Sequence, residues 1–246
     1  MPTEHPSPSC AAALYLIPCT LGATPVEQVL PSYNRDIILR LRHFIVEEVR
    51  TARRFLKQVD RDIDIDALTF YPMGKHADAA QFSAYLAPLR KGESVGVISE
   101  AGCPAVADPG AEVVAIAQRE GLRVVPLVGP SSILLAVMGS GLGGQNFAFH
   151  GYLPVDSAER QKTLRRLEAR SAAEGQTELF IETPYRNKKL FDDVTRALAP
   201  TTRLCVAAGI TTEDEWIRTL TVRQWKQQGL PDLKKIPAIF AIRAKR

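Results

Sequence analysis

The segment VISEAGCPAVADPG, residues 97–110, combines residue types that suit a ligand-binding loop. It begins as an apolar strand, passes through small residues around Gly102, and ends at Asp108, which we predict caps a helix with Pro109 at its first position. A plain strand-to-helix connection needs about two to six residues, and this one is longer. Glycine admits a ligand to the backbone, and an acid such as Glu100 at the end of a parallel strand often contacts a ribose or a cation. We therefore predict a flat, polar ligand against this loop; the alternative is an ordinary connection.

A second segment, LVGPSS at 127–132, has the same character. It follows an apolar run and places serine hydroxyls at the expected start of a helix, where free backbone amides are also available to a ligand. In the first loop, Cys103 has no histidine near it in the sequence, which favours a weakly polar pocket wall over a nucleophile. We expect both loops to line one site.

Other chemistries lack their sequence signatures. The chain has no G-x-x-x-x-G-K-[ST] phosphate loop and no G-x-S-x-G nucleophile elbow. The glycine cluster at 139–144 follows a predicted helix, so we interpret it as a connection. Four histidines without metal-ligand spacing and four cysteines without C-x-x-C spacing predict neither a metal site nor a disulfide framework.

The first half of the chain alternates short apolar runs with helical patterns. The runs predict strands at 11–18, 43–47, 67–71, 94–99 and 123–128. Helical patterns follow at 49–59, at 77–92, and after Pro25, Asp108 and Gly129. This alternation indicates a parallel sheet with helices on both faces, and such sheets bind ligands at the carboxyl ends of their strands.

The second half has more strands and fewer long helices. Strands are predicted at 147–154, 177–183, 203–209, 215–222 and 236–243, with a basic helix around 159–170 and another helix at 185–198. This composition indicates a mixed sheet. We therefore predict two α/β domains, 12–128 and 129–246, with a ligand cleft that faces both, and a disordered tail at 1–11.

Composition and charge limit the class of protein. The 246 residues are 46% hydrophobic and 24% charged, and no apolar run is long enough for a transmembrane helix. The start lacks a secretory signal, and the cysteine usage is typical of a reducing cytoplasm. The net charge of +4 is mild, but basic residues concentrate at 35–61 and 159–170. These runs are either solvated helix faces or a surface that follows nucleic-acid phosphates.

Five segments together resemble a known family. LYLIPCTLG, VISEAGCPAVADPG, VVPLVGPSS, FHGYLP and LFIETPYR occur in the order and at roughly the spacing of the tetrapyrrole methylase family. The resemblance covers the chain from about residue 12, and it is greatest to the branch of the small-subunit ribosomal RNA 2'-O-ribose methyltransferase I. It implies a methyltransferase that uses S-adenosylmethionine, with two α/β domains that enclose the cofactor, usually in a homodimer.

The resemblance also implies which residues contact the cofactor. In the N-terminal domain and at its end these are Pro18, Thr20, Glu100, Ala101, Gly102, Cys103, Val106 and Gly129. In the C-terminal domain they are Ser131, Ser132, Ala207, Ala208, Pro237 and Ala238. Residues 100–103 and Val106 are expected at the methionine and ribose part. Gly129, the two serines and the backbone near Ala207 and Ala208 are expected at the nucleoside.

The chain departs from the family in segments expected to face the methyl acceptor. The first loop lacks the G-x-G-x-G of the tetrapyrrole enzymes, which disfavours a corrinoid or sirohaem substrate. The rRNA branch has E-D-T-R-x-T-R after its second strand, and this chain has EEVRTAR at 47–53. After the third strand, FYPMGKHA keeps only His76 as a polar match.

Methyl transfer from a sulfonium mainly requires alignment of donor and acceptor, which can supply roughly 7–11 kcal/mol. A ribose hydroxyl is a poor nucleophile, so a base or a favourable charge would add roughly 10²–10⁴-fold. The candidates for this catalytic role are Glu182, Arg186, Glu48 and Arg50. The alternative for Glu182 and Arg186 is an internal ion pair.

Three classes of function are compatible with these features. The family branch and the basic runs favour an S-adenosylmethionine-dependent methyltransferase that acts on a ribose 2'-hydroxyl of small-subunit rRNA. The changed acceptor segments are compatible with a methyltransferase of a small metabolite or tetrapyrrole. The third class is a non-catalytic protein that binds S-adenosylmethionine. We expect a cytoplasmic homodimer with an RNA partner, no metal and no membrane.

Overall fold

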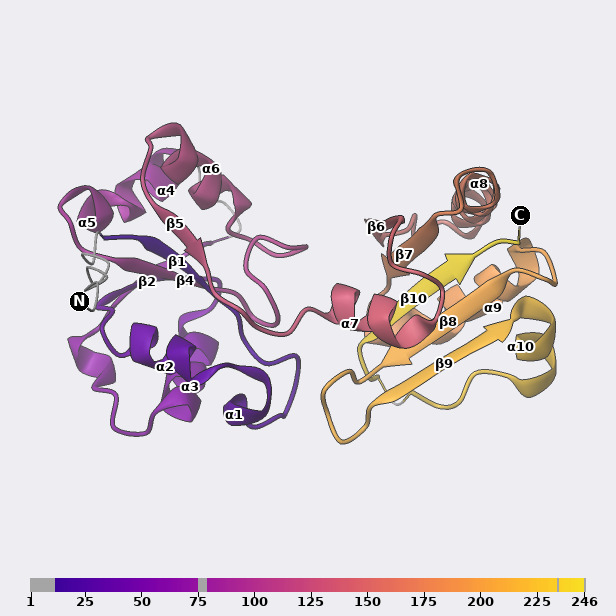
Figure 1. The fold of residues 1–246 in the computed structure, drawn as a ribbon, viewed down its shortest axis with the longest axis horizontal. Helices are drawn as coiled ribbons and strands as arrows, with labels where there is room; N and C mark the ends of the chain where they lie inside the picture. The colour runs from indigo at the N-terminus through magenta and orange to yellow at the C-terminus, as the bar shows by residue number, and fades with distance from the viewer. Residues whose placement is uncertain (1–11, 75–78, 234, 246) are drawn as a thin grey trace, which may run out of the picture. The chain divides into compact units, whose positions relative to one another are not determined.

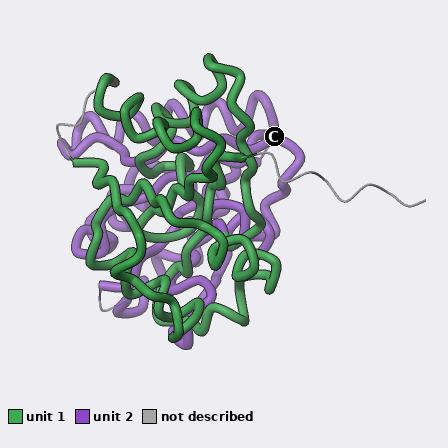
Figure 2. Tube along the Cα trace, turned by 90° about the vertical axis from the view of Figure 1, so that its left-hand side faces the viewer, with its two compact units in different colours: residues 1–130 green, residues 131–246 purple. Residues whose placement is uncertain are grey.

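The computed structural model describes residues 12–74, 79–233 and 235–245. These residues form two compact units, of which unit 1 ends at Pro130 and unit 2 begins at Ser131 (Figures 1 and 2). The predicted boundary after residue 128 lies two residues earlier. The tail predicted at 1–11 and the polar match at His76 lie outside the described residues.

Unit 1 contains a five-stranded sheet in which every neighbouring pair of strands is parallel. Its order is β3-β2-β4-β1-β5. The strands are β1 (Leu14–Ile17), β2 (His43–Val46), β3 (Thr69–Pro72), β4 (Val95–Ile98) and β5 (Val124–Pro126). The central strand β4 is buried along its whole length, which explains its continuous apolar sequence. The predicted parallel sheet is confirmed.

Helices cover both faces of this sheet (Figure 1). One face is covered by α1 (Val26–Val29), α2 (Ser32–Ile38) and α3 (Val49–Val59). The other is covered by α4 (Ala79–Tyr85), α5 (Ala87–Arg90) and α6 (Ala111–Arg119). Successive residues of β2 enter different cores, because Phe44 belongs to the core that contains Phe55 of α3, whereas Ile45 belongs to the core that contains Val113 of α6. A short 3-10 turn, η1 (Ile65–Ala67), precedes β3.

The start of α6 corrects the sequence prediction. Asp108 and Pro109 do not open the helix; it begins at Ala111, and Gly110, with φ 119°, is the cap residue. The amide of Ala105 instead donates to the carbonyl oxygen of Pro109 (3.2 Å). This bond closes a turn that holds the Asp-Pro pair in the loop, so the local helix-start signal is overridden.

Unit 2 contains a five-stranded mixed sheet of order β6-β7-β10-β8-β9. The strands are β6 (Phe147–Tyr152), β7 (Thr177–Ile181), β8 (Arg203–Ala208), β9 (Trp216–Thr221) and β10 (Ala238–Arg243). β6 and β7 are parallel, and the other neighbouring pairs are antiparallel. The carboxyl ends of β6, β7 and β8 therefore share one edge of the sheet with the amino end of β10. The predicted mixed sheet is confirmed.

The two faces of this second sheet are covered unequally. One face packs against α8 (Ser157–Glu174), α9 (Asn187–Ala197) and α10 (Val222–Gln228), around the fully buried Trp225. The opposite face packs against α7 (Ser132–Ser140), where a side chain at Gly139 would meet Ile217. Sequence patterns did not predict α10, which begins at a capping box formed by Thr221 and Gln224.

A buried ion pair joins α8 to α9. The Nε of Arg160 donates to Asp193 Oδ2 (2.8 Å), and its Nη1 donates to the carbonyl oxygens of Pro154 and Val155 (both 2.9 Å). The hydroxyl of Ser157 donates to Asp193 Oδ1 (2.9 Å). Burial raises the pKa of Asp193, but the bonds from Arg160 and Ser157 outweigh burial and hold it below its usual value. The pair therefore fixes the segment that follows β6 as well as both helices.

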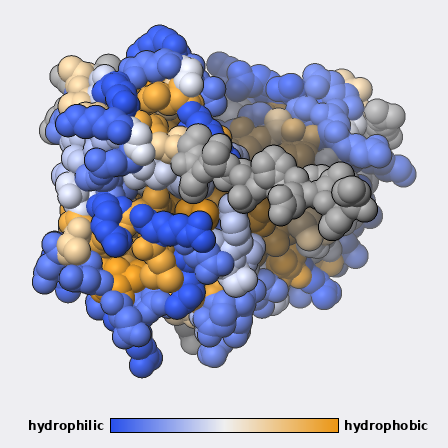
Figure 3. Space-filling model, turned by 60° about the vertical axis from the view of Figure 1, so that its left-hand side comes forward, coloured by the Kyte–Doolittle hydropathy of each residue, from blue (hydrophilic) through white to orange (hydrophobic). Residues whose placement is uncertain are grey.

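No helix among the described residues is both long and apolar enough to cross a membrane. The face in Figure 3 carries hydrophilic side chains with hydrophobic ones between them.

The buried pair predicts a large loss of stability when one partner is removed. Asp193→Ala leaves the Arg160 charge buried and unpaired, so we expect the free energy of unfolding of unit 2 to fall by about 3–5 kcal/mol. Urea unfolding followed by tryptophan fluorescence reports on unit 2, because both tryptophans, Trp216 and Trp225, lie there. The matched control is Asp192→Ala, which removes an exposed pair with Lys188 and should cost about 0–1 kcal/mol. Equal losses in the two variants would contradict this account.

Candidate functional site

The loops that follow β1, β4 and β5 contact one another in unit 1. Cys19 and Gly102 exchange two backbone hydrogen bonds, with N–O distances of 2.9 and 3.2 Å. The thiol of Cys103 donates to the carbonyl oxygen of Pro130 (3.4 Å). Gly129 lies so close to Pro18 that a Cβ at this position would be 2.3 Å from its ring. The structure thus brings four of the predicted site residues together: Pro18, Gly102, Cys103 and Gly129.

The loop after β4 needs small residues because its backbone is unusual. Gly102 has φ +70°, and Ala105 and Ala107 have φ 66° and 61°. Non-glycine residues in this left-handed region cost of order 1 kcal/mol or more each, and such strain concentrates at functional sites. The predicted contact Val106 lies between the two alanines and is 49% exposed. The loop therefore presents its backbone and a few small side chains to solvent.

Three carboxyl groups gather at the carboxyl ends of β2 and β4. Glu47 follows β2 directly, and its carboxylate accepts a hydrogen bond from the backbone of Glu100. The other oxygen of Glu47, Oε2, is buried without a hydrogen-bond partner. Glu100 accepts a bond from the Thr51 hydroxyl, and Asp108 accepts one from the Ser99 hydroxyl. Within the described chain none of the three acids forms an ion pair.

Burial and mutual repulsion perturb these acids. Burial, followed by the charge of Glu47, raises the pKa of Asp108 to about 6. Burial and then the charge of Glu100 raise the pKa of Glu47. The neighbouring thiols are not activated, because burial also raises the pKa of both Cys19 and Cys103. The cluster therefore has a surplus of negative charge, and a cationic ligand group would relieve it.

Two of the four predicted catalytic residues, Glu48 and Arg50, lie at the start of α3. Glu48 caps this helix, and its carboxylate accepts the amide of Arg50 (3.2 Å). The Arg50 side chain is exposed and makes no ion pair among the described residues. Of the two consecutive acids, Glu47 and not Glu48 joins the acidic cluster. Strand periodicity is the signal that could have separated them, because alternate residues of β2 point to different faces.

The other two predicted catalytic residues, Glu182 and Arg186, form an ion pair after β7 (2.8 Å). Glu182 Oε1 also accepts the amide of Thr183 (2.7 Å). The side chain of Glu182 is 4% exposed and that of Arg186 is 39% exposed. The alternative of an internal ion pair therefore describes their contacts, and a catalytic role stays a prediction.

The predicted cofactor residues of unit 2 occupy two places. Ser131 caps α7, while Ser132 is its first residue. The other four lie where β8 ends and β10 begins; they are Ala207, Ala208, Pro237 and Ala238. The two residues of β8 and Ala238 are buried, and Pro237 is the exposed member of this group. Their contacts to a cofactor stay predictions, as do those of Thr20, Ala101 and the two serines.

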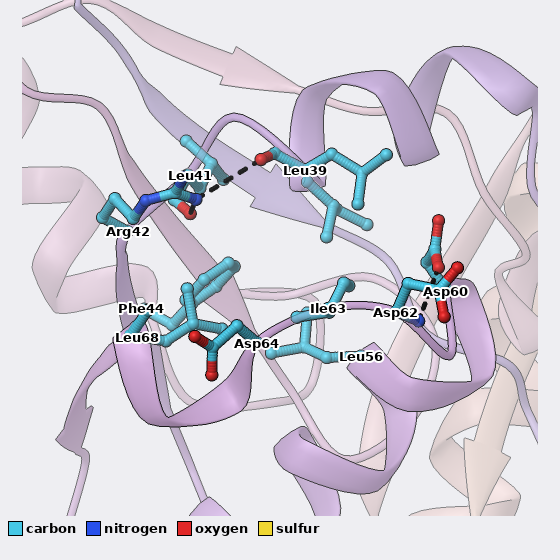
Figure 4. Close-up of a pocket in the computed structure, with 12 residues that line it drawn as sticks. Leu39, Leu41, Arg42, Phe44, Leu56, Asp60, Asp62, Ile63, Asp64 and Leu68 are labelled. Carbon is cyan, nitrogen blue, oxygen red and sulfur yellow. Dashed lines mark hydrogen bonds between the residues drawn. The ribbon is translucent and has the colours of Figure 1, made fainter.

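A cavity of about 320 Å³ lies elsewhere in unit 1 (Figure 4). Residues 38–44 and 56–68 line it, at the amino ends of β2 and β3, with apolar side chains such as Phe44 and three aspartates. It shares no residue with the predicted site, which lies at the carboxyl ends. Within the described ranges, no three His, Cys, Asp or Glu side chains are placed to hold a metal ion.

The raised pKa of Asp108 predicts a pH-dependent stability. The folded state binds the proton more tightly than the unfolded chain, so stability from this group is present below about pH 4 and is lost as pH rises through about 6. Asp108→Asn removes this loss, so the variant should gain stability over the wild type by of order 1 kcal/mol between pH 4 and pH 7, after allowance for solvent screening.

Urea unfolding followed by circular dichroism at both pH values measures this difference. Glu112→Gln, which changes an exposed acid of α6, is the control and should show no such change. If the free energies of unfolding of Asp108→Asn and the wild type differ by the same amount from pH 4 to pH 7, the pKa of Asp108 is not raised in the folded protein.

Comparison with known proteins finds relatives named ribosomal RNA small subunit methyltransferase I. The ribosomal RNA small subunit methyltransferase I of Mesorhizobium japonicum is 34% identical over 90% of this chain and 71% of its own length. The protein of the same name from Escherichia coli O157:H7 is 30% identical over 80% of this chain and 65% of its own length. The chain thus spans about two thirds of the length of these relatives.

Solved structures share the fold. The methyltransferase CobJ covers 95% of this chain and of its own, with a TM-score of 0.62 at 15% identity. A uroporphyrin-III C-methyltransferase from Thermus thermophilus, complexed with S-adenosylhomocysteine, gives a TM-score of 0.55 at 16% identity, covering 94% of this chain and 97% of its own. Residues 8–225 match the family described as Tetrapyrrole (Corrin/Porphyrin) Methylases. The chain therefore belongs to the tetrapyrrole methylase family of S-adenosylmethionine-dependent methyltransferases.

Proposed function

We propose that this protein methylates a ribose 2'-hydroxyl of small-subunit ribosomal RNA. The observation that carries the proposal is the 34% identity over 90% of the chain to a ribosomal RNA small subunit methyltransferase I. Relatives with this name and 27–31% identity also occur among other bacteria. The choice of the 2'-hydroxyl rests on the five motifs of the sequence.

The loops that follow β1, β4 and β5 in unit 1, together with the three acids beside them, fit S-adenosylmethionine. This cofactor supplies a methyl group activated on a sulfonium, and its ammonium adds a second positive charge. Glu47, Glu100 and Asp108 offer negative charge without cationic partners, and Glu47 Oε2 lacks a hydrogen bond. Gly102 and Gly129 hold backbone where a side chain would clash or be strained. We infer that the acids bind the charged and hydroxyl groups, while the glycine backbone admits the nucleoside.

The acceptor hydroxyl must be held in line with the methyl group and must lose its proton. Glu182 is the candidate to take that proton, and its pairing with Arg186 would orient the carboxylate before the acceptor binds. Glu48 and Arg50 are proposed to act on the acceptor side as well, where Arg50 is free to contact a phosphate.

Exposed cations on two helices favour an RNA acceptor. On α3 they are Arg50, Arg53, Arg54 and Lys57; on α8 they are Lys162, Arg165, Arg166 and Arg170. On α3 they begin at the carboxyl end of β2, next to Glu47, and continue along the helix. Phosphate contacts of this kind make affinity strongly dependent on salt. A small uncharged metabolite would have no use for them.

The proposal includes a homodimer in the cytoplasm. The family resemblance supports the dimer, and the ribosomal acceptor supports the location. Size-exclusion chromatography with light scattering measures the mass directly, and a monomer at micromolar concentration would contradict the dimer.

The function is tested by nucleoside mass spectrometry of small-subunit rRNA from cells with and without the gene. We expect one 2'-O-methylated nucleoside to disappear on deletion and to return on complementation. Purified protein with S-adenosylmethionine should restore it on subunits from the deletion strain. No change in any rRNA nucleoside would contradict the proposal and favour a small-molecule acceptor or a non-catalytic role.

The role of Glu182 is tested by Glu182→Gln. If its carboxylate takes the proton, kcat should fall by roughly 10²–10⁴-fold while the affinity for S-adenosylmethionine stays unchanged. Arg186→Lys, which keeps a positive charge beside the carboxylate, is the comparison and should lose far less. Full turnover by Glu182→Gln would leave the residue with only the structural ion pair.

A further inference from the structure

Two tyrosines of unit 2 are exposed at one edge of its sheet. Tyr152 is 62% exposed and Tyr185 is 77% exposed. Tyr152 ends β6 and Tyr185 follows β7, and these neighbouring strands are parallel, so both rings lie at the edge that carries Glu182. Rings with so much surface in water contribute little to the stability of the fold, which points to a role in binding.

The turn that carries Tyr185 is rigid. Pro184 fixes its own φ, and the amide of Arg186 donates to the carbonyl oxygen of Thr183 (2.8 Å). The ion pair between Glu182 and Arg186 closes the same turn (2.8 Å). The backbone that carries Tyr185 is therefore held in place while its ring stays exposed, which lowers the backbone entropy lost when a partner binds it.

A cation lies over this ring. The Nζ of Lys235 is 5.1 Å from the centroid of Tyr185, and the ring keeps most of its surface open. In the turn, Tyr185 lies between the apolar Pro184 and the charged Arg186, and Thr183 precedes them. A nucleotide can use the ring for its base and the cations for its phosphate.

The strand that carries Tyr152 is bent at its end. Phe149 pairs with Leu179, but the next pair is Tyr152 with Ile181, so β6 has one extra residue. Gly151, with φ +64°, lies at this irregularity. Bulges redirect side chains, and they are frequent beside functional sites. The Arg160 bonds to Pro154 and Val155 then fix the chain immediately after Tyr152.

We propose that Tyr185, with Lys235 on its ring and Tyr152 at the same sheet edge, forms a stacking surface for unpaired bases of the RNA acceptor. This inference rests on the proposed function. It assigns the recognition of single-stranded RNA to unit 2, beside the candidate base Glu182, and it separates base stacking from the phosphate contacts of the basic helices.

The test is the binding of a fluorescein-labelled single-stranded RNA of about 12 nucleotides, measured by fluorescence anisotropy. Tyr185→Ala should weaken binding about tenfold, since one base–aromatic stack is worth about that much. Tyr185→Phe should bind like the wild type, and Tyr185→Leu should bind as weakly as the alanine variant. Tyr152→Ala should lose affinity as well, and the same RNA in a duplex should show no loss with any variant.

The matched control is Tyr33→Ala, which removes another exposed tyrosine (58%), on α2 of unit 1, and should change nothing. Lys235→Gln should reduce the salt dependence of binding, whereas Tyr185→Ala should leave it unchanged. Circular dichroism checks that each variant is folded.

Several outcomes would overturn the stacking surface. Wild-type affinity in Tyr185→Leu would mean a general apolar contact, and a change from dimer to monomer in Tyr185→Ala would mean a subunit interface. Unchanged RNA affinity in Tyr185→Ala, with normal rRNA methylation by the wild type, would reject this inference and leave the proposed function standing. Absence of rRNA methylation by the wild type would reject the proposed function itself.

Discussion

The two backbone hydrogen bonds between Cys19 and Gly102 are the constraint on which the candidate site depends. Because β1 and β4 are neighbours in a parallel sheet, the loops after them leave the same edge, and these bonds join the loops directly. The close contact of Gly129 with Pro18 adds the loop after β5. Main-chain atoms thus set the shape of the site, so small residues are required and few side chains can be specified by chemistry alone.

The acidic cluster lowers the stability of the loops that this backbone arrangement holds together. Glu47, Glu100 and Asp108 have no cationic partner among the described residues, and burial with repulsion raises the pKa of two of them. A protein selected for stability alone would replace at least one with an amide. The proposed cofactor, which carries positive charge, would offset this repulsion. The cofactor loses that charge when it gives up the methyl group, so the same acids would favour the substrate form over the product.

Sequence patterns predicted the elements well because strand periodicity and burial on both faces are local signals. All ten strands lie within or overlap their predicted runs. They failed where a longer-range contact decides: Asp108 and Pro109 form a good helix start, yet the turn closed by Ala105 keeps them in the loop. Glu47 and Glu48 are equivalent in composition, and only their places relative to β2 and α3 separate a cluster acid from a helix cap. The pairing of Glu182 with Arg186 was open in the sequence for the same reason.

The candidate binding features of the two units differ in kind: those of unit 1 are mainly backbone, and those of unit 2 are exposed side chains. In unit 1 the candidate site is made largely of backbone that the strand order holds in place. In unit 2 the candidate features lie at the edge of the sheet where β6 and β7 end. They are exposed side chains, such as Tyr152 and Tyr185, that the fold does not need for its core. Arg160 and Asp193 hold the chain that follows Tyr152, so this exposed position can change with little loss of stability. The acceptor therefore has to be inferred from exposed side chains and charge.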